Sequence, residues 1–376
     1  MPLDLAFATT RSLAAKPGAA LELGARLKAM GASRALVVTD PGVRRAGLLE
    51  APLATLAEAG VTAEIFDEVV PDPTDRVVLA AGSRARGMDA VVGFGGGSAM
   101  DVAKLAAALA GSDQPLDGMY GVGFVTGPRL PLVLVPTTAG TGSEVTPISI
   151  VTTGGEEKKG IVSPVLLPDL ALLDPALLAG LPRHVTAATG IDAMVHAIEA
   201  YTSRHRKNPI SDALAREALV LLARGLPRAW ADGSDLEARG DTLLGACLAG
   251  MAFANAPVAA VHALAYPVGA RFHVPHGLSN ALVLPAVLRF NLPAASPLYA
   301  ELAPILKPGA GGADLPDLMA ELSRALELPQ GLRHVGIGET DLPSLAADAM
   351  RQTRLLVNNP REVTEADALA LYQESY

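Results

Sequence analysis

Residues 90–111 read AVVGFGGGSAMDVAKLAAALAG, an apolar run that passes through a glycine-rich turn into an alanine-rich helical pattern. Strand, tight turn and helix in this order predict an α/β fold with an anion site, because the new helix points its first N–H groups at the turn. The turn contains Gly95, Gly96, Gly97 and Ser98. Counted from Gly93, Ser98 takes the sixth place, so the usual G-x-G-x-x-G spacing is absent. A purely structural glycine turn is the alternative.

Helices and strands alternate through the rest of the first half. Helices are predicted at residues 21–31, 48–60 and 75–86, and strands at residues 33–40, 61–66 and 132–135. This alternation predicts a mostly parallel sheet that binds its ligand at the carboxyl ends of the strands. Asp40 ends the first strand, a position from which a carboxylate binds ribose hydroxyls and repels a 2′-phosphate. A helix N-cap is the alternative role for Asp40.

A second polar loop follows the apolar strand in LVLVPTTAGTGSEVT, residues 132–146. Its small and hydroxyl-bearing residues are Thr137, Thr138, Gly140, Thr141, Gly142 and Ser143. Hydroxyl groups and exposed backbone amides suit phosphates or the amide of a nicotinamide ring. Taken alone, an ordinary Ser/Thr-rich loop is equally compatible with this composition. Together with the glycine turn, the loop favours a dinucleotide site.

The strand-like pattern stops after residues 166–174, and helical patterns follow. Helices are predicted at residues 181–203, 209–224, 236–254 and 257–265, with several more out to residue 373. The predicted fold is therefore an α/β nucleotide-binding domain with a mostly parallel sheet at residues 1–180. An all-α metal-binding domain is expected at residues 181–376.

All seven histidines fall in this helical half. In TGIDAMVHAIEAYTS, residues 189–203, Asp192 and His196 are spaced i, i+4 and lie on one face of a helix. Residues 257–280 contain His262 and His276, and a turn through Pro275 can bring the second to face the first. One carboxylate and three imidazoles suit a divalent transition metal, although each histidine alone is more often packed or solvated.

Composition excludes several classes of partner. The net charge of −9, the lack of a Lys/Arg cluster and the 4% aromatic content argue against binding of nucleic acid. No uninterrupted apolar run approaches the roughly 20 residues that a membrane span requires. The single cysteine, Cys247, excludes an internal disulfide, and Asp4 and Arg11 interrupt any signal-like core. A cytoplasmic protein with no membrane partner is expected.

Four segments, in this order, resemble the iron-containing (group III, metal-dependent) alcohol dehydrogenase family over essentially the whole chain. They are GFGGGSAMDVAK, PTTAGTGSEVT, TGIDAMVHAIEAYTS and VHALAYPVGARFHVPHGLSN. The resemblance implies a metal bound by Asp192, His196, His262 and His276, with Fe²⁺ as the usual ion and Zn²⁺ also compatible. It implies homodimers or larger homo-oligomers as well.

The resemblance also implies NAD(P) as cofactor, with Asp40 favouring NAD over NADP. The residues that it assigns to the cofactor are Asp40, Gly95, Gly96, Gly97, Ser98, Asp101, Thr137, Thr138, Thr141, Ser143 and Lys158. The adjacent Lys159 leaves the position of the lysine open by one residue. Both cofactor loops lie in the predicted α/β domain.

One position departs from the family pattern. Many members have a second histidine four residues after the third ligand, credited with relaying a proton, whereas Tyr266 stands there in this chain. The free pKa of tyrosine is about 10, so such a relay needs a lowered pKa or another group. His273, three residues before His276, is the substitute candidate. Packing in the wall of the site is the alternative role for Tyr266.

The function implied is reversible hydride transfer between NAD(P) and a primary alcohol or aldehyde, or a related hydroxy or oxo compound, with a divalent metal as Lewis acid. Two alternatives stay open. A sugar-phosphate cyclase-like lyase of the same architecture needs a dense cluster of lysine and arginine near the metal, and Arg271 alone does not supply one. A non-catalytic nucleotide-binding protein would bind NADH without turning over any alcohol.

Overall fold

A computed structural model of the 376-residue chain describes residues 5–154 and 157–376. The chain divides into two compact units. The first, the α/β unit, is Ala8–Gly180. The second, the helical unit, is Leu181–Tyr376 together with residues 5–7.

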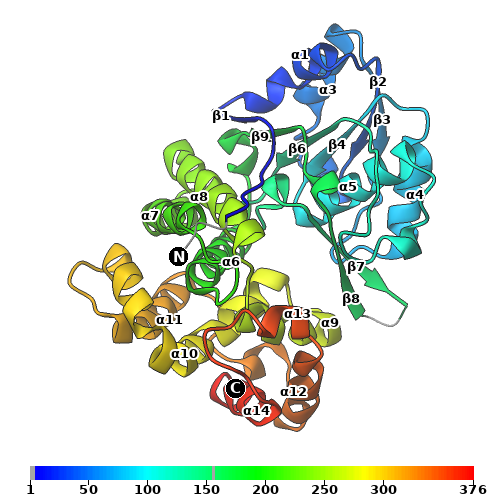
Figure 1. Ribbon diagram of the computed structural model, residues 1–376. Coiled ribbons are helices and arrows are strands. Elements are labelled where there is room, and N and C mark those ends of the chain that lie inside the picture. Colours follow the sequence, from blue (N-terminus) through cyan, green and yellow to red (C-terminus); the bar gives the residue numbers. More distant parts are fainter. Residues whose placement is uncertain (1–4, 155–156) are drawn as a thin grey trace. The chain divides into compact units, whose positions relative to one another are not determined.

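The α/β unit is built on a six-stranded sheet in which every neighbouring pair is parallel (Figure 1). In spatial order its strands are β1 (Leu13–Ala15), β9 (Leu170–Leu173), β6 (Leu132–Pro136), β4 (Ala90–Gly95), β2 (Arg34–Val38) and β3 (Thr62–Phe66). The prediction of a mostly parallel sheet is confirmed. The chain steps outward from β2 to β3 and then returns to place β4 on the other side of β2, so the strand order reverses between β2 and β4.

Helices cover both faces of this sheet because its strands are apolar on both sides. Successive side chains of a strand point to opposite faces. Val37, Val92 and Val133 belong to one core with α1 (Leu23–Ala29) and α3 (Glu50–Glu58). Leu36, Val91 and Leu132 belong to a second core with α4 (Asp75–Ala85) and α5 (Gly97–Gly111). Burial of both faces is typical of parallel sheets in α/β proteins.

A second, smaller sheet was not predicted. It contains β5 (Gly121–Val122), β8 (Glu157–Val162) and β7 (Ile148–Thr153) in that order, with β7 and β8 antiparallel. β7 follows directly on the polar loop, and β8 begins with the charged stretch EKKG, so neither shows a long apolar alternation. Lys158 therefore lies on a strand of this sheet.

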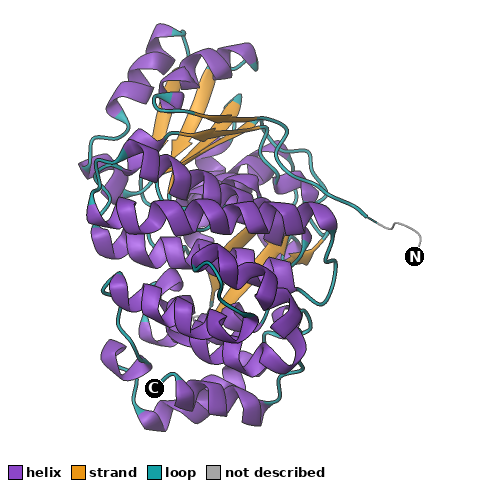
Figure 2. Cartoon of the chain, turned by 90° about the vertical axis from the view of Figure 1, so that its left-hand side faces the viewer, coloured by secondary structure: helices purple, strands orange, loops and turns teal. Residues whose placement is uncertain are grey.

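From Arg183 on, the described residues form helices and no strand, and helices make up most of the chain as a whole (Figure 2). The helices are α6 (Arg183–Thr202), α7 (Pro209–Ala231), α8 (Leu236–Asn255), α9 (Ala260–Phe272), α10 (His276–Leu306), α11 (Leu315–Ala325), α12 (Leu342–Met350), α13 (Thr353–Leu356) and α14 (Glu365–Glu374). The prediction of an all-α region is confirmed. From Thr186 to Thr202, every residue of α6 except Thr189 is buried, including the polar side chains of Asp192, His196 and Glu199. Buried polar groups are costly unless they are paired, so α6 marks a site inside the unit.

Among the described helices, α10 alone is long and apolar enough to cross a membrane by length and hydropathy. α8 and α9 pass the same test only as one span bent by 107°. Half of the apolar window of α10 is buried within the protein, and the first two turns of the helix carry His276 and the buried Asn280. These are the features of a core helix.

Candidate metal centre and cofactor loops

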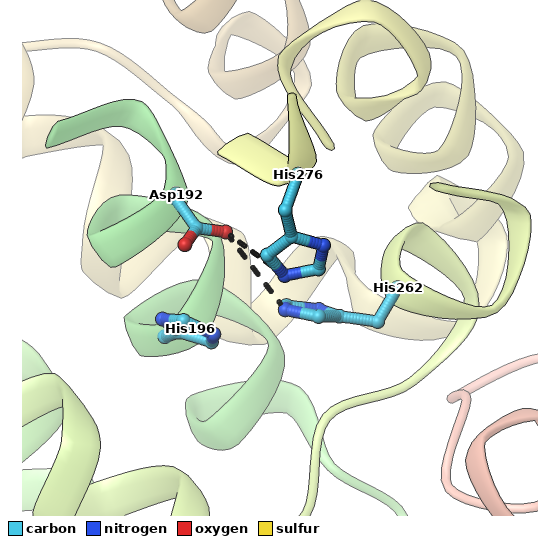
Figure 3. Close-up of side chains that lie close together, drawn as sticks. All are labelled: Asp192, His196, His262 and His276. Carbon is cyan, nitrogen blue, oxygen red and sulfur yellow. Dashed lines mark ion pairs between the residues drawn. The ribbon is translucent and has the colours of Figure 1, made fainter. Parts of the chain in front are cut away.

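Asp192, His196, His262 and His276 lie together in the helical unit (Figure 3). Each residue offers one possible ligand atom, and these four atoms all lie within 4.8 Å of one another. Asp192 Oδ1 lies 4.0 Å from His262 Nε2 and 3.7 Å from His276 Nε2. α6 presents Asp192 and His196 one turn apart, whereas α9 supplies His262 and α10 begins at His276. The structure thus brings all four sequence-predicted metal ligands into one cluster.

The cluster is buried on most sides and open at His276. Asp192, His196 and His262 are each at most 4% exposed. The side chain of His276 is 32% exposed, so this residue is the member of the cluster that solvent contacts. The ring of His196 stacks on those of Phe253 and His262, with centroids 4.3 and 4.7 Å apart. This stacking restricts the orientation of the His196 ring.

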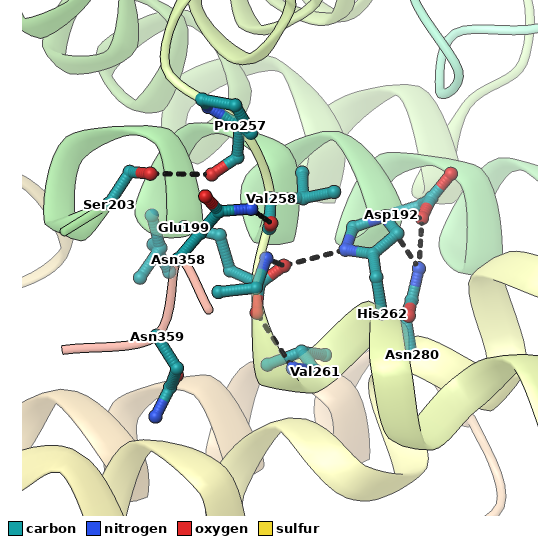
Figure 4. Close-up of polar contacts among 12 residues, drawn as sticks. Asp192, Glu199, Ser203, Pro257, Val258, Val261, His262, Asn280, Asn358 and Asn359 are labelled. Atoms are coloured by element: carbon teal, nitrogen blue, oxygen red, sulfur yellow. Dashed lines mark hydrogen bonds and ion pairs between the residues drawn. The ribbon is translucent and has the colours of Figure 1, made fainter. Parts of the chain in front are cut away.

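Glu199, which the sequence reasoning missed, fixes the orientation of His262 (Figure 4). His262 Nδ1 lies 2.7 Å from Glu199 Oε2, and because a carboxylate only accepts, Nδ1 is the donor. His262 Nε2 therefore presents its lone pair to the cluster, the state that a metal-binding imidazole requires. The backbone N–H groups of Ala259 and Val261 donate to the same carboxylate at 2.9 and 2.7 Å. Glu199 thus holds both the ring and the start of α9.

Asn280, also missed, touches three of the four predicted ligands. Its Nδ2 donates to Asp192 Oδ1 at 2.6 Å and lies 3.3 Å from Nε2 of both His262 and His276. Its Oδ1 is buried and without a hydrogen-bond partner. Asp192 Oδ1, His262 Nε2 and His276 Nε2 thus all face the same point, as the ligand atoms of a cation do. The donor set of one carboxylate and three imidazoles fits Fe²⁺ or Zn²⁺.

The electrostatics of the cluster keep Asp192 ionised. Burial alone would raise the pKa of Asp192. The positive charges of His196, His276 and His262 in their protonated form, which a metal ion replaces when it binds, and the hydrogen bond from Asn280 outweigh burial and hold this pKa below its ordinary value. Asp192 is therefore available as an anionic ligand at neutral pH.

Gly277 permits the close approach of α10 to α6. A Cβ atom at this position would lie 2.4 Å from the backbone oxygen of Ala188 and 3.2 Å from Asp192 Cβ. Real Cβ atoms essentially never come within 3.0 Å of another heavy atom, so a larger residue would push the start of α10 away. The glycine therefore places the preceding His276 beside Asp192.

The two candidates for the proton relay differ in position. Tyr266 lies one turn after His262 on α9, and its ring centroid is 5.8 Å from that of His276. His273 is exposed at the end of α9, with a left-handed backbone (φ 54°). Arg271, in the last turn of α9, is exposed and pairs with Asp348 at 3.4 Å. The geometry therefore favours Tyr266.

The two predicted cofactor loops lie side by side in the α/β unit. Gly95, at the end of β4, pairs with Pro136 at the end of β6, and Thr137 N donates to Gly95 O at 3.0 Å. A Cβ atom on Gly97 would lie 2.7 Å from the side chain of Thr141. Both loops therefore leave the carboxyl ends of adjacent parallel strands, as ligand-binding loops of such sheets do.

Asp40 performs the capping role that was the alternative interpretation. Its Oδ1 accepts hydrogen bonds from Gly42 N at 2.8 Å and Val43 N at 3.0 Å, at the start of the short helix α2 (Pro41–Arg45). A Cβ atom added to Gly95 would lie 3.1 Å from Asp40 Oδ2. The carboxylate thus also borders the glycine turn, between β2 and β4, where the strand order reverses and doubly wound sheets bind ligands.

The remaining predicted cofactor residues have these positions. Lys158 Nζ, on β8, pairs with Asp72 at 2.7 Å, and its side chain is almost fully buried. Lys159 is exposed, because adjacent residues of a strand point to opposite faces. Asp101 and Ser143 are hydrogen-bonded to each other at 2.6 Å.

Both halves of the chain match one family. The family described as "Iron-containing alcohol dehydrogenase" matches residues 10–175, and "Fe-containing alcohol dehydrogenase family, C-terminal" matches residues 186–376. Long-chain-alcohol dehydrogenase 1 of Geobacillus thermodenitrificans is 41% identical over 374 residues, covering 96% of this chain and 93% of that protein. NAD-dependent methanol dehydrogenase of Bacillus methanolicus is 35% identical, covering 93% and 94% of the two chains.

Among solved structures, one described as 1,3-propanediol oxidoreductase superposes with a TM-score of 0.94 at 37% identity, and the match covers all of both chains. The chain therefore belongs to the iron-containing alcohol dehydrogenase family. It is an oxidoreductase of that class.

Proposed function

We propose that this protein is an NAD-dependent alcohol dehydrogenase or aldehyde reductase that holds one divalent ion, Fe²⁺ or Zn²⁺, on Asp192, His196, His262 and His276. The reaction is reversible hydride transfer between nicotinamide and a primary alcohol or aldehyde. The observation that carries the proposal is the convergence of four ligand atoms within 4.8 Å. Asp40 beside the glycine turn, and the relative named for its NAD dependence, support NAD over NADP.

A divalent ion bound there supplies Lewis-acid chemistry, which polarises a carbonyl and lowers the pKa of an alcohol. The residues of the chain determine how well it does so. Asp192 contributes one negative charge and the imidazoles contribute none, so the ligand set leaves the ion a net positive charge. Glu199 keeps the lone pair of His262 turned inward, and His276 is the ligand that solvent contacts.

An aldehyde screen tests the proposed reaction. Wild-type protein loaded with Fe²⁺ or Zn²⁺ is expected to oxidise NADH in the presence of at least one member of a panel of short aldehydes, semialdehydes, diketones and oxo-acids. A chelator should abolish the activity, and restored metal should recover it. Binding of NADH with no turnover across the panel would instead indicate a non-catalytic nucleotide-binding protein.

Tyr266 is proposed to hold the proton that leaves or enters the substrate oxygen. Tyr266→Phe should lower kcat by about 10²-fold or more and change the pH–rate profile, since positioned acid–base groups contribute about 10²–10⁴-fold. His273→Ala should leave both unchanged, because His273 is exposed at the end of α9. Retention of the wild-type profile by Tyr266→Phe would remove this role from the tyrosine.

Asp40 is proposed to select NAD. Asp40→Gly should raise the ratio of kcat/KM for NADPH to that for NADH by about tenfold, because it removes the charge that opposes a 2′-phosphate. Glycine is also accepted as an N-cap at a cost of only a few tenths of a kcal/mol, so α2 should persist. Asp113→Asn is the matched control. Asp113 is fully exposed and follows the C-terminal end of α5, whereas the glycine turn lies at the N-terminal end, so this substitution should leave the ratio unchanged. An unaltered ratio in Asp40→Gly would refute the assignment.

A cytoplasmic location and a homodimeric or larger assembly are proposed with this function. The single, buried Cys247 fits a reducing compartment, and the resemblance to the family supports self-association. Light scattering on purified protein tests the assembly.

A further inference from the structure

Two adjacent asparagines near the C-terminus, Asn358 and Asn359, are buried in the helical unit and take no part in the proposed reaction. They follow α13, outside any helix, and are 5% and 1% exposed. A buried amide is costly unless it is hydrogen-bonded. The partners of these two side chains therefore show what this segment of the chain holds in place.

Asn358 holds the connection between α8 and α9 (Figure 4). Residues 256–259 form this connection, and His262 follows in the first turn of α9. Asn358 Nδ2 donates to Val258 O at 3.0 Å. The next N–H group of the connection donates to Glu199, the carboxylate that also orients His262. A shift of the connection at Val258 would therefore disturb the bond that turns His262 toward the cluster.

The same segment is bonded to the end of α6, the helix that carries two of the predicted metal ligands. Asn358 O accepts a hydrogen bond from Arg204 N at 2.7 Å. One residue earlier, Ser203 Oγ donates to Pro257 O at 2.7 Å, so the end of α6 also reaches the connection directly (Figure 4). Asn358 thus fixes the start of α9 relative to α6.

Asn359 bonds the segment to α10, the helix that begins with the predicted ligand His276. Asn291 Nδ2, on α10, donates to Asn359 Oδ1 at 3.0 Å, and Asn359 Nδ2 donates to Asn291 Oδ1 at 2.7 Å. Both side chains are at most 3% exposed. Because the two amides bond reciprocally, α10 cannot slide or turn about its axis without breaking both bonds.

We propose that Asn358 and Asn359 are positioning residues that hold α6, α9 and α10 in place relative to one another, and thereby set the affinity of the cluster for a divalent ion. The inference rests on the proposed metal-dependent function. Neither asparagine is a member of the cluster. Asn358 acts through the connection before α9, and Asn359 acts through α10.

Asn358→Leu tests the first bond, because leucine keeps nearly the same shape and removes the donor to Val258 O. We expect the Kd for Zn²⁺ to rise about three- to tenfold, less than the 10- to 100-fold typical of a residue bonded directly to a ligand. The visible absorption of Co²⁺ bound at the cluster should change as well, because it depends on ligand geometry. The Kd for NADH should not change, since both cofactor loops lie in the α/β unit.

Asn291→Leu tests the second bond from the side of α10. It removes both reciprocal hydrogen bonds and leaves residues 357–361 unaltered. The Kd for Zn²⁺ should again rise about three- to tenfold, with a changed Co²⁺ spectrum.

Asn208→Leu is the matched control, because Asn208 is also a buried asparagine of the helical unit. Its side chain caps α7 and bonds only to Arg206 and Ser211, close to it in the sequence. Loss of this cap should lower Tm. The Kd for Zn²⁺ and the Co²⁺ spectrum should remain those of wild type, which separates positioning of the ligands from general destabilisation.

A lowered Tm with wild-type Zn²⁺ affinity and Co²⁺ spectrum in both Asn358→Leu and Asn291→Leu would overturn the inference, because the asparagines would then only stabilise the fold. If Asn358→Leu does not fold, Asn291→Leu decides in the same way. Wild-type protein that binds no divalent ion would overturn the proposed function itself, a result distinct from equal binding by wild type and variants.

Discussion

His276→Ala is expected to lose the bound metal and the NADH-dependent reduction of aldehydes together, while the helical unit stays folded. His276 is the partly exposed first residue of α10, so its removal leaves no large cavity in the core. Three ligands remain, too few to fill a four-ligand protein site. Activity should fall at least about 10³-fold, because a Lewis acid contributes several kcal/mol to the reaction.

Metal content, activity and circular dichroism measured on one preparation test this expectation. His334→Ala is the matched control, since His334 is exposed and outside the cluster, and it should keep metal and activity. Full turnover by metal-stripped His276→Ala protein would reject the assignment of this histidine.

Glu199→Gln is expected to weaken metal binding about 10- to 100-fold without changing any ligand, the usual effect of losing the partner of a metal-binding histidine. The carboxylate accepts three hydrogen bonds, from His262 Nδ1 and from the N–H groups of Ala259 and Val261. A glutamine keeps the shape but has only one accepting oxygen. The ring of His262 should therefore no longer be held with its lone pair toward the cluster.

Competition with a metal chelator measures this loss of affinity. Glu217→Gln, an exposed glutamate on α7, is the matched control and should bind metal as wild type does. Wild-type metal affinity in Glu199→Gln would show that Glu199 serves the start of α9 and not the metal site.

The fold could be predicted where its signals are local. The apolar strand, glycine turn and helix at residues 90–111 appear as β4 and α5, and the strand at residues 61–66 as β3. β1 could not be predicted, because three residues carry no periodicity and the strand exists only by pairing with β9. The helix predicted at residues 209–224 continues to Ala231 through Pro227, since Leu226 and Ala229 are buried in the core.

The four predicted metal ligands could be anticipated from their spacing in the sequence, but the residues that orient them, Glu199 and Asn280, could not. Asp192 and His196 share a helical face by their i, i+4 spacing alone. Glu199, three residues after His196, and Asn280, four after His276, carried the same kind of signal. Their roles depend on which groups the facing helices present, which one helix does not reveal. Glu199 meets the start of α9, and Asn280 meets ligands from α6 and α9.

X-ray absorption spectroscopy of protein reconstituted with Fe²⁺ or Zn²⁺ tests the proposed metal centre most directly. One ion per chain is expected, with a shell of one oxygen and three imidazole nitrogens at about 2.0–2.2 Å, besides any solvent or substrate oxygen. His276→Ala, reconstituted in the same way, should retain no stoichiometric ion. Failure of the wild-type protein to retain a stoichiometric ion, or an ion whose shell contains no imidazole, would contradict a metal-dependent reaction at this cluster.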